Sequence, residues 1–199
     1  MRAMWRTRVL AAAVTILALA SINTGQAASK ELSERSVKVL MDYAWVILPS
    51  KFTRPDGKVI EVDKKNHKKE TLIPIDTARD VIKVGYTSAQ AQLCEMWEEQ
   101  TTNYDAMIRI LRSKHDWSEQ QLLYITTLHR MTIHMAAGKL KVADKNGEQI
   151  VSLEPITPGK DTCNDEKRKR VKEIVAQHVE AAKTASPPKK AEAPASQKK

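Results

Sequence analysis

Histidine and methionine side chains gather in one short stretch, residues 128–135, which reads LHRMTIHM. Thioether and imidazole donors together suit copper in an oxidising compartment, where free thiolates would be lost. On a helix that turns about 100° per residue, His129 and His134 lie about 140° apart, so the two imidazoles do not bind one ion. Met131 and Met135 share a face, with His134 within about a third of a turn. These last three residues form an alternative, a copper site.

Core packing is the competing explanation for both methionines, because their face also carries Tyr124 and Leu128. His129 falls among the apolar residues Leu122, Ile125 and Ala136. We therefore expect His129 to be a core histidine with a hydrogen-bond partner, and we expect no cofactor.

The two cysteines, Cys94 and Cys163, offer a second kind of chemistry. No C-x-x-C spacing indicates redox catalysis, and an exported protein meets oxidising conditions. The sequence therefore predicts a structural disulfide that holds the last helix against the middle one, with a redox or metal pair as the alternative. It would close a loop of roughly 70 residues, which the chain-entropy model values at about 4 kcal/mol.

Motifs of known enzyme classes are absent from the sequence. It contains no G-x-S-x-G, no H-E-x-x-H, no glycine-rich phosphate loop and no C-x-x-C-H haem site. Glu95, Glu98 and Glu99 beside Trp97 could supply a general acid, but no partner carboxylate is identifiable. An exposed helix face explains these acidic residues better, and the sequence predicts a protein that is not an enzyme.

The first 27 residues have the pattern of a secretory signal peptide. Three arginines precede an apolar run from Val9 to Ile22, and small residues follow at the positions that signal peptidase reads. We expect cleavage after Ala27 and a periplasmic mature protein. The alternative is an uncleaved anchor, for which the apolar run is short.

The C-terminal segment, residues 183–199, is rich in lysine, proline and alanine and has almost no apolar bulk, so we expect it to be disordered. It is a solubilising tail or, alternatively, makes weak contact with anionic envelope polymers. The leader carries three of the net +9 charges and this tail four, which leaves +2 for residues between them. That balance argues against a nucleic-acid partner, and acidic neighbours of the basic run at 167–170 indicate a salt-bridged surface.

Residues 28–182 are expected to form one domain, within which residues 76–138 have the strongest helical periodicity. Asp76 is predicted to cap the start of this run. Weak helix formers at 85–88 and 101–103 predict a kink or restart. The stripe predicted to face the core consists of Ala78, Val81, Ile82, Gly85, Ala89, Leu93, Met96, Trp97, Tyr104, Met107, Ile108 and Leu111.

A further helix within this run has clear end signals. Ser118 and Gln121 predict a capping box, Trp117 can pack on Leu122 as a hydrophobic staple, and Gly138 is a natural residue just past the helix end. The short connection at 113–116 predicts that the helices on either side pack antiparallel as a hairpin.

Two more helices flank this central run. The first begins near Ser29 or Ser33 and ends at Leu48, before a proline. Its predicted buried face holds Leu32, Val37, Leu40, Met41, Ala44, Ile47 and Leu48, and Tyr43, Trp45 and Val46 widen the apolar arc. The last begins at Asp161 or Thr162, with Val171, Ile174, Val175, His178 and Ala182 on one side.

Two β-hairpins are predicted between the helices. One turns at residues 55–57, which read PDG, and the other at Asn146-Gly147, between strands at 140–142 and 149–153. The basic run from Lys64 to Lys69 reads as a solvated loop, with an anion-binding site as the alternative.

These patterns predict a mainly α fold: a bundle of about four helices, two small hairpins and a disordered tail. The predicted function is that of a periplasmic interaction or accessory protein with a protein partner in the cell envelope. The aromatic residues Tyr43, Trp45 and Trp117 are predicted to contact that partner, since aromatic anchors dominate interfaces. On this hypothesis, Trp45→Ala weakens partner capture and leaves the fold intact.

Overall fold

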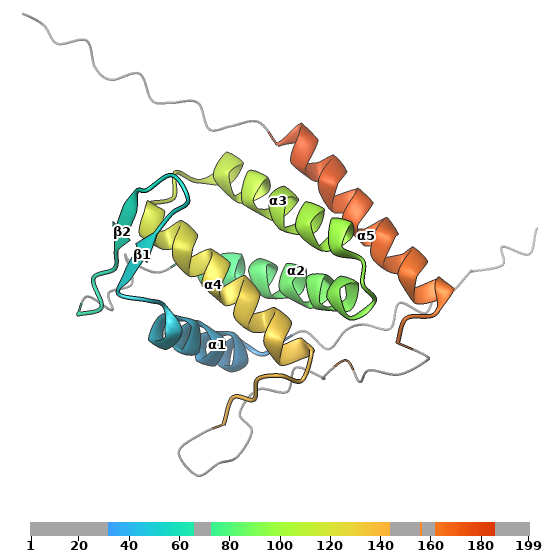
Figure 1. Ribbon diagram of the computed structural model, residues 1–199, viewed down its shortest axis with the longest axis horizontal. Coiled ribbons are helices and arrows are strands. Elements are labelled where there is room, and N and C mark those ends of the chain that lie inside the picture. Colours follow the sequence, from blue (N-terminus) through green and yellow to red (C-terminus); the bar gives the residue numbers. More distant parts are fainter. Residues whose placement is uncertain (1–31, 66–72, 144–155, 157–161, 186–199) are drawn as a thin grey trace, which may run out of the picture. The chain divides into compact units, whose positions relative to one another are not determined.

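A computed structural model describes residues 32–65, 73–143, 156 and 162–185 (Figure 1). These contain five helices and one two-stranded sheet. The helices are α1 (Glu34–Ile47), α2 (Ile75–Leu93), α3 (Trp97–Lys114), α4 (Glu119–Ala136) and α5 (Asp165–Thr184), and the strands are β1 (Lys51–Thr53) and β2 (Val59–Glu61). The mainly helical fold is confirmed. The predicted strand at 140–142 is not a strand. The predicted leader, the tail beyond residue 185, the second hairpin's turn and return strand, and residues 66–69 of the basic run lie outside the described residues.

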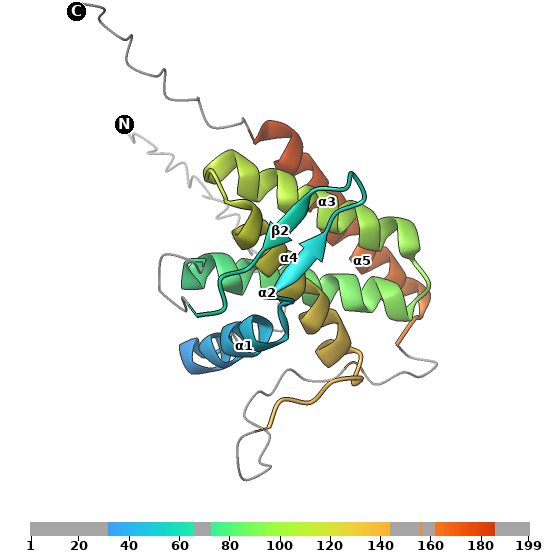
Figure 2. The same cartoon turned by 60° about the vertical axis from the view of Figure 1, so that its left-hand side comes forward.

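Helix α2 is the centre of the bundle, because it contacts each of the other four helices. Helix α4 packs chiefly on α2, whereas α3 packs on α2 and α5 (Figures 1 and 2). Helices α3 and α4, which were predicted to lie antiparallel as a hairpin, therefore approach each other less closely than either approaches α2. Side chains still join these two helices, since the hydroxyls of Tyr104 and Thr126 share a 2.8 Å hydrogen bond.

The long helical run is interrupted between α2 and α3, at residues 94–96, and both of the weak stretches predicted to break it are helical. Glu95 adopts the left-handed conformation, with φ of 57°. This turn changes the rotational phase of the helix that follows. Trp97 therefore begins α3 with 57% of its surface exposed, and its predicted place on the buried stripe is wrong.

The predicted capping box and the glycine just past the end of α4 are confirmed, whereas the staple of Trp117 on Leu122 stays a prediction. The Ser118 hydroxyl accepts a hydrogen bond from the Gln121 backbone N–H, and the Gln121 side chain accepts one from the Ser118 N–H. At the other end, Gly138 has φ of 70°, and the N–H groups of Gly138 and Lys139 donate to the carbonyls of Met135 and His134. This Schellman motif needs a residue that tolerates positive φ.

Of the three other helix starts that were predicted, one is confirmed and two differ. Ser33 caps α1 as expected, and its hydroxyl accepts from the Ser36 N–H. Asp76 does not cap α2, because the helix already begins at Ile75 after Pro74. Asp76 instead lies in the first turn, where a carboxylate favours the positive end of the helix dipole. Helix α5 begins three residues later than Thr162 suggests, because Asn164 accepts from the Lys167 N–H.

The hairpin of β1 and β2 forms around the predicted turn, with Gly57 at φ of 82°. The strands are antiparallel, with Phe52 opposite Ile60. Arg54 and Lys58 form salt bridges with Glu119 at 3.1 and 3.0 Å. These contacts fix the hairpin against the first turn of α4.

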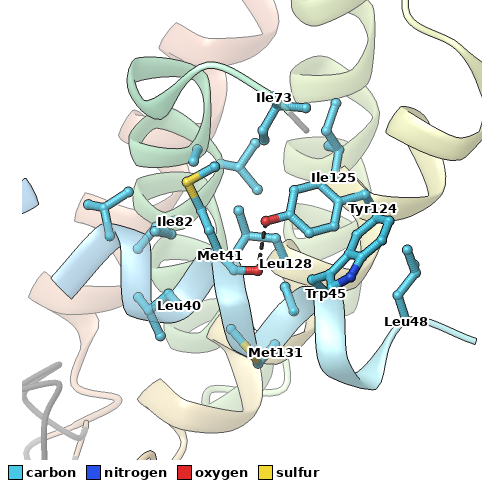
Figure 3. Packing of buried hydrophobic residues seen from close by; sticks show 14 of the residues in the cluster. Leu40, Met41, Trp45, Leu48, Ile73, Ile82, Tyr124, Ile125, Leu128 and Met131 are labelled. Carbon is cyan, nitrogen blue, oxygen red and sulfur yellow. Dashed lines mark hydrogen bonds between the residues drawn. The ribbon is translucent and has the colours of Figure 1, made fainter. Parts of the chain in front are cut away.

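The principal core lies among α1, α2, α3 and α4 (Figure 3). The Tyr124 hydroxyl donates to the Met41 carbonyl over 2.8 Å, and the Trp45 ring meets the Tyr124 ring edge-on at 6.3 Å between centroids. Ile47 is half exposed, so its predicted place on the buried face of α1 is wrong. None of the helices described is both long enough and apolar enough to cross a membrane.

A disulfide joins Cys94 to Cys163, as predicted, with 5.2 Å between their Cα atoms. It lies beside a separate apolar cluster where α5 meets α2 and the turn after it, formed by Ala91, Cys94, Met96, Val171 and Val175. Disulfides of this kind persist in oxidising compartments.

Candidate functional site

A chain of four polar side chains crosses the bundle from α4 to α5. The Nε2 atom of His129 on α4 lies 3.1 Å from the Ser88 hydroxyl on α2. Ser88 accepts a 3.0 Å hydrogen bond from the Asn103 amide on α3, and Asn103 Oδ1 lies 2.9 Å from His178 Nδ1 on α5. We call these four residues the polar network. It ties together four of the five helices described.

The hydrogen bonds of Asn103 determine where one proton lies. Its amide nitrogen also contacts the Val84 carbonyl at 3.2 Å, and a carbonyl can only accept, so the NH₂ group must face Val84 and Ser88. The Oδ1 atom therefore faces His178 and can only accept. The Nδ1 atom of His178 must carry a proton, and neutral His178 keeps its lone pair on Nε2.

Burial determines the charge of the other histidine. His129 is 3% exposed, and burial together with the positive charge of Arg130 lowers the pKa of His129 from 6.5 to about 4. Burial also lowers the pKa of His178, and the charge of Asp80 opposes this in part. His129 is thus neutral at pH 7, and its interpretation as a core histidine with a hydrogen-bond partner is confirmed.

The contact between Ser88 and His129 has the separation of a nucleophile and its general base. Ser88, however, has no exposed surface, and its hydroxyl already accepts from Asn103. A nucleophile must reach a substrate atom, which this hydroxyl does not. The arrangement instead aligns helices, since a fully satisfied buried network specifies one packing of the elements that it joins.

The His178 end of the network reaches the surface at a shallow depression between α2, α3 and α5. Its surface is largely apolar, and its lining residues include Val84, Thr87, Ile174 and Gln177. A wide, open hollow of this kind surrounds little of a small molecule, whereas ligand pockets bury most of their ligand. The depression is thus a weak candidate for small-molecule binding.

The three residues predicted to contact a partner are buried or half-buried by contacts within the chain itself. Trp45 is 7% exposed and Trp117 is 9% exposed, and the Trp117 indole donates to the Leu111 carbonyl at 2.9 Å. Tyr43 is half-buried, and its hydroxyl donates to the Ala143 carbonyl at 2.6 Å. Their contact with a partner stays a prediction, and the two tryptophans present little surface for it.

Exposed apolar surface occurs beside them, at the C-terminal end of α1. Val46 is 74% exposed and Ile47 is 52% exposed. Lys64 donates to the carbonyls of Trp45 and Val46, and its ammonium group lies 5.3 Å from the centroid of the Trp45 ring. We call Val46 and Ile47 the apolar pair. They are held on a helix whose end is secured by Lys64.

The donors of the alternative copper site lie in different environments. Met131 and Met135 are buried in the principal core, whereas His134 is exposed. In the described part of the chain, no three histidine, cysteine, aspartate or glutamate side chains lie together as a metal-binding group. The copper site stays a prediction without support from this geometry.

Sequence reasoning missed Ser88, Asn103 and His178 as members of one network. Ser88 and Asn103 were interpreted as weak helix formers, and His178 only as part of an apolar side. The available signal was that each is a polar residue on the buried side of its helix, where polar groups need partners. That signal identifies the residues as needing hydrogen-bond partners, but it does not show which of them bond to one another.

The pKa of His129 predicts how the stability of the protein depends on pH. The unfolded chain binds a proton near pH 6.5 and the folded chain near pH 4, so the free energy of unfolding falls as the pH falls through this window. We expect a loss of about 3 kcal/mol from this residue. Urea denaturation at a series of pH values measures it.

The variant His129→Gln removes the titrating ring and keeps an amide beside Ser88, so it should flatten that part of the profile. His134→Gln replaces an exposed imidazole on the same helix and is the matched control, which should keep the wild-type slope. Equal slopes for His129→Gln and the wild type would contradict the assignment.

The described residues thus offer a polar network enclosed in the bundle, a shallow depression at one end of it, and an apolar pair on the surface of α1. Of these, the apolar pair is the feature most accessible to a macromolecule. Comparison of the chain with protein-family models, with curated proteins and with solved structures found no match.

Proposed function

We propose that this chain is an exported, non-enzymatic interaction protein of the periplasm, and that the apolar pair is its contact with a protein partner in the cell envelope. The observation that carries the proposal is the exposure of Val46 and Ile47 side by side on a helix otherwise anchored in the core. Association that buries exposed apolar side chains against a partner removes them from water, and this is favourable in free energy.

Export is supported by the disulfide and by the leader predicted from the sequence. The Cys94–Cys163 bond is typical of an oxidising compartment. The arginines and apolar run before Ala27 have the order of a cleaved signal. Together they favour the periplasm over the cytoplasm as the place where the partner is met.

The position of the apolar pair also favours binding. A partner that contacts Val46 and Ile47 orders little of this chain, because the helix that bears them is already packed through Val37, Leu40 and Ala44. Binding to such a preorganised surface avoids the entropy cost of ordering a loop. Burying each of these side chains is worth about 1.5–3 kcal/mol.

The double variant Val46→Asp/Ile47→Asp tests the proposal. Both positions are exposed, so the free energy of unfolding should change by no more than about 0.5 kcal/mol for each. Loss of the apolar contact should weaken capture of the partner at least about tenfold, since tenfold corresponds to about 1.4 kcal/mol. Capture is measured by cross-linking in intact cells, followed by purification of the tagged chain.

Trp97→Asp is the matched control, because Trp97 is a large exposed apolar residue at the start of a different helix. It should leave capture unchanged. Equal capture by the double variant and the wild type, or equal losses in the double variant and Trp97→Asp, would exclude the apolar pair as the contact. The intact mass of the recovered chain reports separately on removal of residues 1–27.

A further inference from the structure

Helix α5 is attached to the rest of the protein in a different way from the other four helices. The principal core is built from α1 to α4, the segments between them and Val142 after α4, and it contains no residue of α5. The apolar contacts of α5 form the separate small cluster around Ala91, Cys94 and Met96. The main core is thus complete without α5.

Helix α5 packs along α3 and also contacts α2, but few of its side chains are buried. Only Val171, Val175 and Ala182 are buried among its 20 residues. Its polar contacts include the His178–Asn103 hydrogen bond and an ion pair between Lys172 and Glu99 at 3.8 Å. Partly exposed ion pairs contribute little to stability. The buried apolar area that holds α5 is thus small, and the disulfide adds a covalent attachment to it.

The disulfide lies where it can hold α5 in place. Cys163 is two residues before the first residue of α5, and Cys94 ends α2, so the bond fastens the start of α5 to the centre of the bundle. Cys94 is buried and Cys163 is half-buried, so Cys163 is the more accessible sulfur. A covalent tether raises the local concentration of α5 at its docking surface.

We propose that α5 is a redox-fastened strap, which a dithiol reductant releases while α1 to α4 stay folded. A thiolate of the reductant attacks the Cys163 sulfur, the S–S bond breaks, and the Cys94 sulfur leaves as a thiolate and takes up a proton. The second thiol of the reductant then displaces the Cys163 sulfur, which is protonated in turn. The two electrons come from the dithiol, which ends as its own disulfide.

Release of α5 uncovers a defined surface on α2 and α3. Ala91 and Met96 lose their apolar neighbours Val171 and Val175, and Asn103 loses its bond to His178. The oxidised chain thus covers a mixed apolar and polar surface that the reduced chain presents to solvent.

Hydrogen exchange of the full chain, followed by mass spectrometry, tests the strap. The oxidised protein is compared with the same protein in dithiothreitol, with iodoacetamide labelling to show that both thiols have formed. Amides of α5 should exchange on the order of a hundredfold faster after reduction, because α5 is then joined to the bundle only through the chain after α4, which lowers its effective concentration. Peptides within residues 78–89 and 119–136 should change less than about twofold.

The variant Cys163→Ser should reproduce this pattern without any reductant. The variant Cys94→Ala/Cys163→Ser is the control for the reductant, which should have no effect on it. Unchanged protection of α5 after complete reduction would show that the disulfide does not hold the strap. Equal loss of protection in α2, α4 and α5 would show that the bundle unfolds as one unit. Either result overturns the proposal.

Discussion

Replacing Trp45 by alanine is expected to lower the free energy of unfolding by about 3–4 kcal/mol, which is typical for the loss of a large buried aromatic side chain. The indole is 7% exposed and packs edge-on against Tyr124 in the principal core (Figure 3). Truncation leaves a cavity beside a tyrosine whose hydroxyl is fixed on Met41. Since small domains are stable by only about 5–15 kcal/mol, the loss is a large fraction of the total.

A second contribution comes from Lys64. Its ammonium group lies over the Trp45 ring and donates to the carbonyls at the end of α1. Burial lowers the pKa of Lys64. Removal of the ring takes away a cation–π contact worth about 0.5–1 kcal/mol and leaves the hydrogen bonds to the helix end.

Urea denaturation measures this effect as a shift in midpoint at constant m-value. Trp97→Ala is the matched control: it removes the same side chain from an exposed position, and it should change the free energy by no more than about 0.5 kcal/mol. A Trp45→Ala protein as stable as the wild type would show that packing of the indole in the core does not contribute to the free energy of unfolding. The sequence-based expectation that this variant leaves the fold intact would then hold after all.

That expectation differs from the structure for a definite physical reason. Helical periodicity identifies an apolar arc, but the arc of α1 is wider than the surface that one neighbouring helix covers. Which edge of the arc is buried depends on where α4 and the hairpin lie, and neither position is encoded locally. Trp45 therefore lies inside, whereas Val46 and Ile47 lie outside.

Features with local causes were predictable from the sequence. The capping box at Ser118, the left-handed Gly138 and the turn at Gly57 each depend on a few neighbouring residues. The disulfide could be predicted because the chain has two cysteines and the sequence pattern of a leader. The break at Glu95 could not, because a non-glycine residue with positive φ has no composition signal.

The polar network shows the same limit at the candidate site. Its four residues come from four helices, and each hydrogen bond within it joins two of them. Every member can be recognised alone as a polar residue on a buried face. The partners become apparent only when the helices are placed, and that placement depends on how closely α2 and α4 approach.

Gly85 is the residue that permits this approach. A Cβ atom on Gly85 would lie 2.8 Å from the Cβ and 2.9 Å from the Cγ2 of Thr132, and 3.1 Å from the His129 carbonyl oxygen. Thr132 is fully buried, and its hydroxyl donates to the Leu128 carbonyl, so it has no open space to move into. The backbone of α4 would have to move away from α2.

Gly85→Ala is therefore expected to destabilise the protein by about 1–2 kcal/mol, and Gly85→Val by about 3 kcal/mol or more. Two effects compete, because alanine gains up to about 1 kcal/mol of helix propensity over glycine. Overpacking of a close-packed interface costs about 1–3 kcal/mol, and this cost exceeds the gain in helix propensity where neither helix has room to move. Midpoints of urea denaturation measure both variants, and a more stable Gly85→Ala protein would show that the helices separate at little cost.

The pair of substitutions Gly85→Ala/Thr132→Gly separates a steric cause from a general disturbance of α2. Thr132→Gly removes both closest contacts, whereas Thr132→Ala keeps the Cβ at 2.8 Å. The double variant Gly85→Ala/Thr132→Gly should be more stable than the sum of its single effects predicts, by about 1 kcal/mol or more. The double variant Gly85→Ala/Thr132→Ala should show a much smaller excess.

The same separation of α2 from α4 should draw Ser88 away from His129, so Gly85→Ala should also raise the pKa of His129 from about 4 as water enters. Unchanged titration of His129 alongside a large loss of stability would place the strain elsewhere than at the crossing of these two helices.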